Sequence, residues 1–381
     1  MARISWPLGA LVAGLCVLWA MLGSFMLPMA RSADFLNFYA GASLVEQGRI
    51  AELHTVQTLK VVKGRVPEAK ALFVRPAFYA ALLAPLAWLR QDLAFDVWVF
   101  SQTLLLLACW LWAWRRFGPD ALVFAALSLP APLGISSAQD CVLLLAAFIA
   151  SYELAERKRW TASGAALALL LIKFHLILLW PVALLLQKRW KMFAGFCGMA
   201  AVEVISCWLL GGTALIRSYI RMLGDKHLDI LSPSPQLMIS YEGFAANLGI
   251  SSPVFNLLLI ASIVVLFVWT VREAPLWRMF AVTAVASELI VPHVYGYDAT
   301  LLLLPIWLTI FNSKQPASKV AAALMATPLP FLFALADRPW AVVSSASMLL
   351  FFAVLVYEKA AAAIKEPYSN PAAVADRTQT V

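Results

Sequence analysis

The chain contains few charged residues for its length. Only 13% of its 381 residues are Asp, Glu, Lys or Arg, whereas about 25% is typical of soluble domains, and 62% are hydrophobic. A soluble core cannot bury this much apolar surface, but a bilayer can, since each membrane span takes roughly 20 apolar residues. The composition therefore predicts an all-α polytopic membrane protein.

Several motifs of common enzyme classes are also missing. No Walker motif, GxGxxG, HExxH or GxSxG occurs in a usable context, so ATPase, nicotinamide and zinc-protease functions have no support. The five cysteines form no CxxC pair and mostly lie inside apolar runs, which favours buried thiols over a disulfide framework or a metal cluster. The net charge of +8 comes from short clusters rather than a basic stripe with interleaved aromatics, so no nucleic-acid partner is expected.

The basic clusters show how the chain crosses the membrane. From Arg115 onward they recur at every second connection between apolar runs, which is the positive-inside pattern. If the short apolar run 78–89 is re-entrant, this pattern predicts the outer segments. They are residues 31–75, 135–140, 173–175, 212–253, 292–297 and 337–339.

Most of the chain is expected to form one membrane domain. Residues 1–365 predict a bundle of about 11–13 transmembrane or re-entrant helices. Residues 7–30 form the first span; a secretory signal is the alternative, but this run is longer than the usual apolar region of about 7–15 residues. Residues 42–53 and 55–64 resemble short amphipathic helices on the membrane surface within the first outer loop, 31–75. Residues 212–253 form a large outer loop, and residues 366–381 a disordered cytoplasmic tail.

Polar residues gather at the outer ends of the predicted spans. They come from at least five segments, and ionisable groups next to apolar spans are costly enough that function is their default explanation. A common site on the outer face would account for all of them. They are Asp34, Arg75, Gln139, Asp140, Lys173, His175, His293 and Asp298.

Each of these residues also has a structural explanation. Asp34 could act as a general base, or it could cap a helix that starts at Phe35. Lys173 and His175 suit the tip of a helical hairpin facing a wet cleft, where a cation would bind phosphate; the alternative is a snorkelling lysine with an incidental histidine. Asp140 is favourable near a helix N-terminus whatever its role.

The remaining candidates are an arginine at the start of an apolar run and the polar residues of a late outer turn. Arg75 offers a planar fork that suits phosphate. His293 could donate or carry a proton near neutral pH. Tyr295 and Tyr297 could stack on a sugar or belong to an aromatic belt at the interface, and Asp298 flanks the same turn.

Five segments together resemble the bacterial polytopic glycosyltransferases of family 87, which have the GT-C architecture and use polyprenyl-phosphate sugars. The segments are DFLNFYAGASL, FVRPAFYAALLAPLAWL, SSAQDCVLLLAAF, LLIKFHLILLWP and PHVYGYDATLLLL. The resemblance covers about residues 1–310. This sequence departs from the family pattern at Arg75-Pro76-Ala77 for Tyr-Pro-Pro, at Ala138 for Gly, and at Phe174 for the Pro between Lys and His.

The resemblance implies roles for the candidate residues. Asp34 matches the catalytic carboxylate of the first loop, and His293 matches a late histidine near the catalytic centre. Lys173 and His175 match hairpin residues near the lipid phosphate, which Arg75 would also contact. The acceptor or sugar would then meet the polar residues that remain. They are Gln139, Asp140, Tyr297 and Asp298.

The function expected from the resemblance is an inverting, mannosyltransferase-like hexosyltransferase. It would move a hexose from a polyprenyl-phosphate sugar to a lipid or glycan acceptor on the outer, periplasmic face of a bacterial cytoplasmic membrane. No cofactor is expected, although Asp34 with Asp140 or Asp298 could hold a divalent cation. A lipid or solute transporter is the alternative, since broken helices with intramembrane charge fit one too. A non-catalytic scaffold of a cell-envelope complex is a second alternative.

Overall fold

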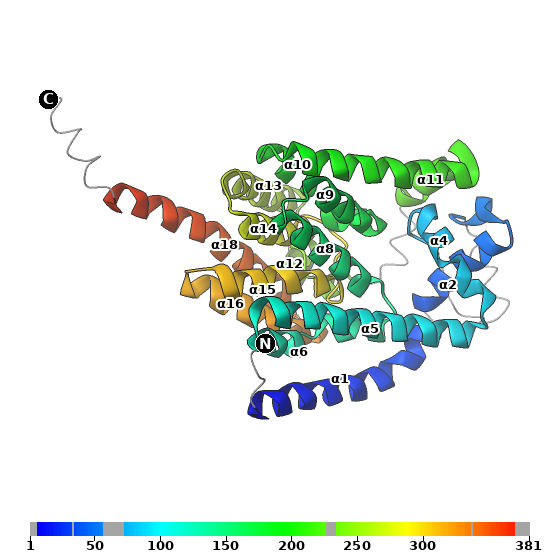
Figure 1. The fold of residues 1–381 in the computed structure, drawn as a ribbon, viewed down its shortest axis with the longest axis horizontal. Helices are drawn as coiled ribbons and strands as arrows, with labels where there is room; N and C mark the ends of the chain where they lie inside the picture. The colour runs from blue at the N-terminus through cyan, green and yellow to red at the C-terminus, as the bar shows by residue number, and fades with distance from the viewer. Residues whose placement is uncertain (1–5, 33, 56–71, 226–233, 337, 370–381) are drawn as a thin grey trace.

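A computed structural model describes residues 6–32, 34–55, 72–225, 234–336 and 338–369. Within them the regular elements are all helical, and Figure 1 shows them gathered into a bundle from which the last helix, α18, extends. In the described part of the chain, six helices are long and apolar enough to cross a membrane. The candidate spans are Gly9–Pro28, Gln91–Phe117, Trp160–Ile177, Trp190–Leu223, Pro253–Val271 and Val342–Ala361. The predicted class, an all-α polytopic membrane protein, is confirmed.

The first helix, α1 (Trp6–Ser32), contains the predicted span 7–30. It lies along the edge of the bundle, where it packs against α6 (Asp120–Leu127) and α7 (Pro130–Ser136) (Figure 1). Its Trp19 indole donates a hydrogen bond to the Ala126 carbonyl at 2.6 Å, which ties α1 to α6. Most of its surface is left for lipid, since little of its apolar window is buried.

The beginning of the first outer loop does not lie on the surface as expected, although residues 46–49 are exposed. Helix α2 (Asp34–Glu46) is apolar nearly all round, and almost every residue from Phe35 to Leu44 is buried. The predicted surface helix 42–53 is therefore wrong: it is divided at Gly48, whose φ is 68°, into the end of α2 and the short η1 (Ile50–Glu52). Of the second predicted surface helix, residues 56–64 lie outside the described part of the chain.

The short apolar run 78–89 forms two brief helices that pack on α2. They are α4 (Ala77–Leu83) and the 3-10 helix η2 (Ala84–Trp88), which contains Pro85. Proline lacks the N–H that would continue the α-helix. This segment therefore carries Arg75, just before α4, into the bundle without a full-length span.

Four further helices pack one against the next across the bundle. Helix α5 (Gln91–Phe117) packs against α8 (Cys141–Glu156), and α8 against α9 (Trp160–Ala168). Helix α9 packs closely on α11 (Trp190–Leu223) through Gly164 and Gly195. A methyl group added at Gly164 would meet the Met192 carbonyl oxygen at 1.8 Å, so the two backbones touch here.

The chain leaves helical geometry at Lys173, the tip of the predicted hairpin. The 3-10 helix η3 (Leu169–Ile177) follows α9, and inside it Lys173 has φ −120° and ψ 65°. The chain then returns through α10 (Trp180–Leu186), so that α11 begins beside the start of α9. Lys173 and His175 therefore lie at the far end of this segment from the basic residues at 157–159 and 188–191.

The most buried helix is α14 (Leu276–Leu289), in which every residue from Met279 to Leu289 is buried. It packs against α13 (Pro253–Val271), α15 (Leu303–Asn312) and α18 (Val342–Ser369). Helix α18 continues four residues into the predicted disordered tail and projects from the bundle (Figure 1). The other elements are η5 (Pro235–Leu237), α12 (Tyr241–Asn247), η6 (Asp298–Leu302), α16 (Pro316–Ala326), α17 (Leu329–Leu332) and η7 (Phe333–Leu335).

The predicted outer loop 212–253 is partly helical. Helix α11 continues past Gly211 and Gly212, whose backbones are not helical, to Leu223. The elements η5 and α12 follow later in the same segment.

Candidate active site

Arg75 and Asp140 form a buried ion pair with two parallel hydrogen bonds. The guanidinium Nε donates to Oδ2 of Asp140 at 2.9 Å and Nη2 donates to Oδ1 at 3.1 Å. Arg75 precedes α4 and Asp140 precedes α8, so the pair joins two segments 65 residues apart. This leaves Nη1 as the guanidinium nitrogen outside the pair.

Lys173 connects this pair to a second carboxylate. Its Nζ lies 2.7 Å from Oδ1 of Asp298 and 3.3 Å from Oδ1 of Asp140, and its side chain is only 3% exposed. It also lies 3.4 Å from the Cys141 sulfur and 5.1 Å from the centre of the Tyr297 ring. The break in helical geometry at Lys173 brings this ammonium group into the bundle.

Arg75, Asp140, Lys173 and Asp298 thus form one ion-pair cluster, in which two cations balance two carboxylates. The backbone holds the cluster as well, because Oδ2 of Asp298 accepts a hydrogen bond from the Tyr295 N–H at 3.0 Å. A buried charge is tolerated only when it is paired and hydrogen-bonded. The Lys173 ammonium group, expected at a wet cleft, is buried and paired with the two carboxylates.

Two histidines and two tyrosines lie next to the ion-pair cluster. The ring centres of His175 and His293 are 6.4 Å apart, those of His293 and Tyr295 4.9 Å, and those of Tyr295 and Tyr297 5.5 Å. Burial lowers the pKa of His293 below its usual 6.5. His293 is therefore mostly neutral at pH 7 and able to accept a proton.

Helix α2 covers the arginine side of the cluster. The Phe38 ring lies 5.9 Å from the Arg75 guanidinium carbon and also contacts Tyr79 and Trp98. Asp34 is the first residue of α2 and stands four positions, about one turn, before Phe38. Its side chain lies outside the described part of the structure.

A match to a known protein family covers much of this site. The model of glycosyltransferase family 87 matches residues 73–292, more than half of the chain. The chain belongs to glycosyltransferase family 87. The match contains Arg75, Asp140, Lys173 and His175, and it ends one residue before His293. No curated protein and no solved structure matches the chain.

The turn before α8 shows how this family 87 member holds Asp140 in place. Ala138 adopts a left-handed conformation with φ 53°, and its carbonyl accepts a hydrogen bond from the Trp98 indole at 2.9 Å. Gln139 is buried beside Asp140, and its backbone N–H donates to the Gly134 carbonyl at 2.8 Å. The resemblance found in the sequence puts glycine where Ala138 stands, and glycine adopts this conformation without the steric cost that alanine bears.

Some residues of the site carried no signal in the sequence of this glycosyltransferase. Cys141 lies 3.6 Å from Oδ1 of Asp298, and Phe38 lies over Arg75, but both look like ordinary core residues in an apolar run. Glu288 in α14 is also buried, and neither of its carboxyl oxygens has a hydrogen-bond partner among the described residues. Only its acidic side chain near the end of an apolar helix could have indicated it.

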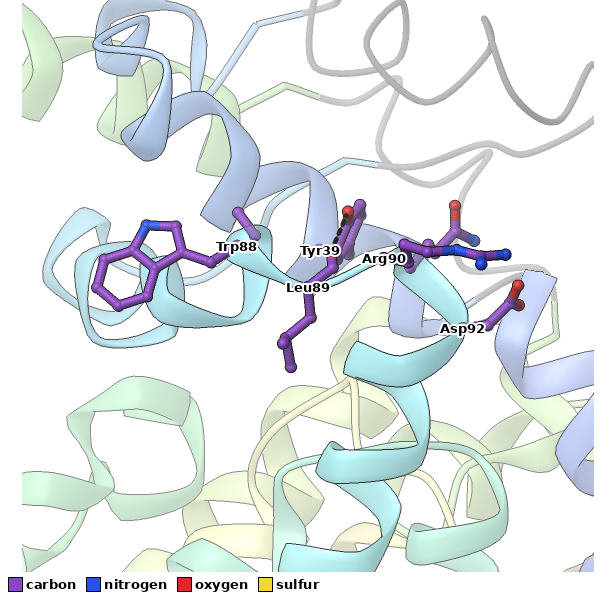
Figure 2. Close-up of a pocket in the computed structure, with 7 residues that line it drawn as sticks. Tyr39, Trp88, Leu89, Arg90 and Asp92 are labelled. Carbon is purple, nitrogen blue, oxygen red and sulfur yellow. Dashed lines mark hydrogen bonds between the residues drawn. The ribbon is translucent and has the colours of Figure 1, made fainter.

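A polar cavity of about 510 Å³ lies beside α2, and the sequence did not predict it. Figure 2 shows it at the junction of η2 and α5, with the exposed Trp88 at one end and Arg90 and Asp92 at the other. The Tyr39 hydroxyl donates to the Leu89 carbonyl at 2.9 Å and fixes α2 against this junction.

The cation site considered from the sequence used Asp34 with Asp140 or Asp298. In the structure, Asp140 pairs with Arg75 and Asp298 with Lys173, and the side chain of Asp34 lies outside the described residues. Among the residues that the structure describes, no group of three His, Cys, Asp or Glu side chains has the arrangement of a metal site.

Proposed function

We propose that this family 87 glycosyltransferase moves a hexose, mannose in the first instance, from a polyprenyl-phosphate sugar to a lipid or glycan acceptor. The ion-pair cluster with the adjoining His175 and His293 is the observation that carries the proposal. It joins ionisable side chains from segments spread over more than 200 residues at one end of the bundle. A bundle needs no such cluster for stability, because replacing a buried ion pair by well-packed apolar side chains often leaves the free energy of unfolding unchanged or raises it.

The donor phosphate would lie against the edge formed by Arg75, Lys173 and His175. Asp140 and Asp298 fix the two cations before the donor arrives, so little reorganisation is needed when the leaving phosphate gains charge. The Arg75 Nη1 is the guanidinium nitrogen that the Asp140 pair leaves available for a phosphate oxygen. The polyprenyl chain would lie among apolar helices facing the bilayer.

The transfer would be a single displacement that inverts the sugar carbon. The acceptor oxygen forms a bond to C1 while the bond from C1 to the phosphate oxygen breaks, and polyprenyl phosphate leaves with the electron pair. Asp34 takes the acceptor proton as general base, and the neutral His293 orients the acceptor or assists. Gln139, Asp140, Tyr297 and Asp298 would contact the sugar or the acceptor.

The membrane side of the reaction follows from the charge pattern. The basic clusters at 115–116, 157–159 and 188–191 mark the cytoplasmic ends of helices by the positive-inside rule. The ion-pair cluster belongs to the opposite ends, so the reaction would take place on the outer face of a bacterial cytoplasmic membrane. No nucleic-acid partner is proposed.

The test is a transfer assay with the purified full-length protein in liposomes. Radiolabelled polyprenyl-phosphate mannose is compared with GDP-mannose as donor, and a lipid extract serves as acceptor. Labelled product is expected from the lipid donor alone, and Asp34→Asn should abolish it. Asp120→Asn, an exposed carboxylate in the first turn of α6, is the matched control and should retain activity. Transfer from GDP-mannose, or full activity of Asp34→Asn, would contradict the proposal.

A further inference from the structure

A second, mostly apolar cavity of about 320 Å³ lies between η3, α4 and α11. Its walls include Ala77 and Phe78 of α4, Leu171 and Phe174 of η3, and Leu215 of α11. Phe174 stands between Lys173 and His175, so the cavity adjoins the ion-pair cluster but contains none of its members.

The cavity faces the bilayer. Val204 and Phe174 line it and are 59% and 38% exposed on the outside of the bundle. Helix α11, which carries Val204, is one of the membrane-spanning helices and has little of its apolar window buried. A molecule would therefore enter from the lipid.

Three polar atoms at the cavity are buried without a partner. They are Nε2 of His54, Oε1 of Glu203 and the hydroxyl oxygen of Tyr219, none of which has a hydrogen-bond partner among the described residues. The His54 and Glu203 residues are only 5% and 4% exposed. An atom that stays unpaired loses its hydrogen bonds to water without replacement, which destabilises the fold.

The tautomer of His54 follows from its other nitrogen. Nδ1 lies 3.1 Å from the Phe73 carbonyl oxygen, which can only accept, so Nδ1 carries the hydrogen. Burial lowers the pKa of His54 to about 4, and the ring is neutral at pH 7. Nε2 therefore offers a lone pair, and it needs a hydrogen-bond donor that the described residues do not supply.

These features exclude two kinds of occupant. A plain hydrocarbon chain would leave all three polar atoms unpaired. An anionic headgroup would meet the Glu203 carboxyl group, while none of the described residues that line the cavity is a Lys or Arg. The missing partner has to be neutral, apolar for most of its length, and equipped with a hydroxyl group.

We propose that this cavity binds a neutral lipid with a free hydroxyl group, of the diacylglycerol class. Its hydroxyl donates to Nε2 of His54 and accepts from the Tyr219 hydroxyl, while the Glu203 carboxyl group, in its protonated form, donates to an ester carbonyl oxygen. The chains extend past Phe174 and Val204 into the bilayer. This binding does not depend on the transferase activity proposed above.

The experiment uses the full-length protein in detergent and a photoreactive 1,2-diacylglycerol. Labelling is competed with dioleoylglycerol, with its 3-O-methyl ether, which lacks the hydroxyl, and with dioleoyl phosphatidate, which is anionic. Dioleoylglycerol should compete at least tenfold better than the other two. Equal competition by all three would overturn the proposal, since the cavity would then hold water or any acyl chain.

Variants locate the binding and separate it from folding. Ala200→Trp fills the cavity and should abolish specific labelling, whereas Val202→Trp, on the lipid-exposed surface of α11 outside the cavity, should leave it intact. Glu203→Gln keeps hydrogen-bonding capacity and should bind within about threefold of wild type. Glu203→Leu should bind about tenfold more weakly without a loss of thermal stability, because it removes a buried unpaired group. Unchanged labelling in both Ala200→Trp and Glu203→Leu would contradict the proposal.

Discussion

Lys173 is the residue on which the ion-pair cluster depends most, because its ammonium group contacts both Asp140 and Asp298. Lys173→Met removes this charge and leaves two buried carboxylates with one cation. Breaking a buried pair from one side costs about 3–5 kcal/mol, so the free energy of unfolding should fall by that amount. Chemical or thermal unfolding in detergent measures it.

An exposed ion pair provides the control for this prediction. Arg116 and Glu156 lie 2.7 Å apart with side chains 41% and 34% exposed. Glu156→Gln should therefore change the stability by less than about 1 kcal/mol. Equal effects of the two substitutions would mean that Lys173 is solvated by water rather than by the carboxylates.

A substitution at Ala138 is expected to raise stability, whereas Lys173→Met lowers it. An L-residue in the left-handed region costs roughly 1–2 kcal/mol, and Ala138 has φ 53°. Ala138→Gly should raise the free energy of unfolding by about 1 kcal/mol without disturbing the Trp98 hydrogen bond to its carbonyl. A loss of stability, measured in the same unfolding experiment, would show that the turn has another conformation in solution.

At this scale the sequence could predict which residues converge but not how they pair. The positive-inside pattern placed Arg75, Asp140, Lys173 and Asp298 on one face, and the structure brings them together. Which carboxylate meets which cation depends on side-chain distances that no spacing encodes. Glu203 and His54 were missed because a lone polar residue near apolar sequence carries no sign of what it faces.

At the scale of elements, the contact of α9 with α11 depends on two glycines. Gly164→Ala would place a methyl group 1.8 Å from the Met192 carbonyl oxygen, so the helices must move apart. A loss of about 1–3 kcal/mol in the free energy of unfolding is expected. Gly198→Ala, in α11 with open space around it, is the control and should be neutral or slightly stabilising. Similar losses in both variants would rule out close packing as the cause.

The elements also show where sequence patterns are reliable. The break at Lys173 was predictable because a lysine in a long apolar run needs a partner or an end, and the chain does leave helical geometry there. The burial of α2 was not predictable, because a short apolar helix can lie on a membrane or inside a bundle. Its burial depends on α4 and η2, which cover it from another part of the sequence.

At the scale of the whole molecule, the orientation in the membrane is open to a direct test. A cysteine at the exposed Pro292, beside His293, should react with a membrane-impermeant maleimide in spheroplasts. A cysteine at Arg157, in the basic connection after α8, should react only after the membrane is permeabilised. Both variants use a Cys197→Ser background, because Cys197 is the exposed native thiol. The reverse accessibility would place the ion-pair cluster in the cytoplasm.

Composition alone predicted the membrane class, since 62% hydrophobic residues leave no soluble alternative. The order of loose motifs predicted family 87, and the family match from 73 to 292 confirms it. The donor, the acceptor and the roles of the site residues stay predictions. Recognition of a sugar uses a few scattered hydrogen bonds, which neither composition nor helix packing specifies.

The central claim is that the ion-pair cluster is the site of sugar transfer rather than a structural feature. The variant Arg75→Met/Asp140→Leu removes both charges of one pair together, so no charge of that pair is left unpaired. The control is Arg278→Met/Glu358→Leu, which removes the pair between α14 and α18. Transfer from polyprenyl-phosphate mannose is measured for both proteins in liposomes, after each is shown to unfold cooperatively. The account predicts a loss of about 100-fold or more for Arg75→Met/Asp140→Leu alone, whereas a folded protein with wild-type transfer would contradict it.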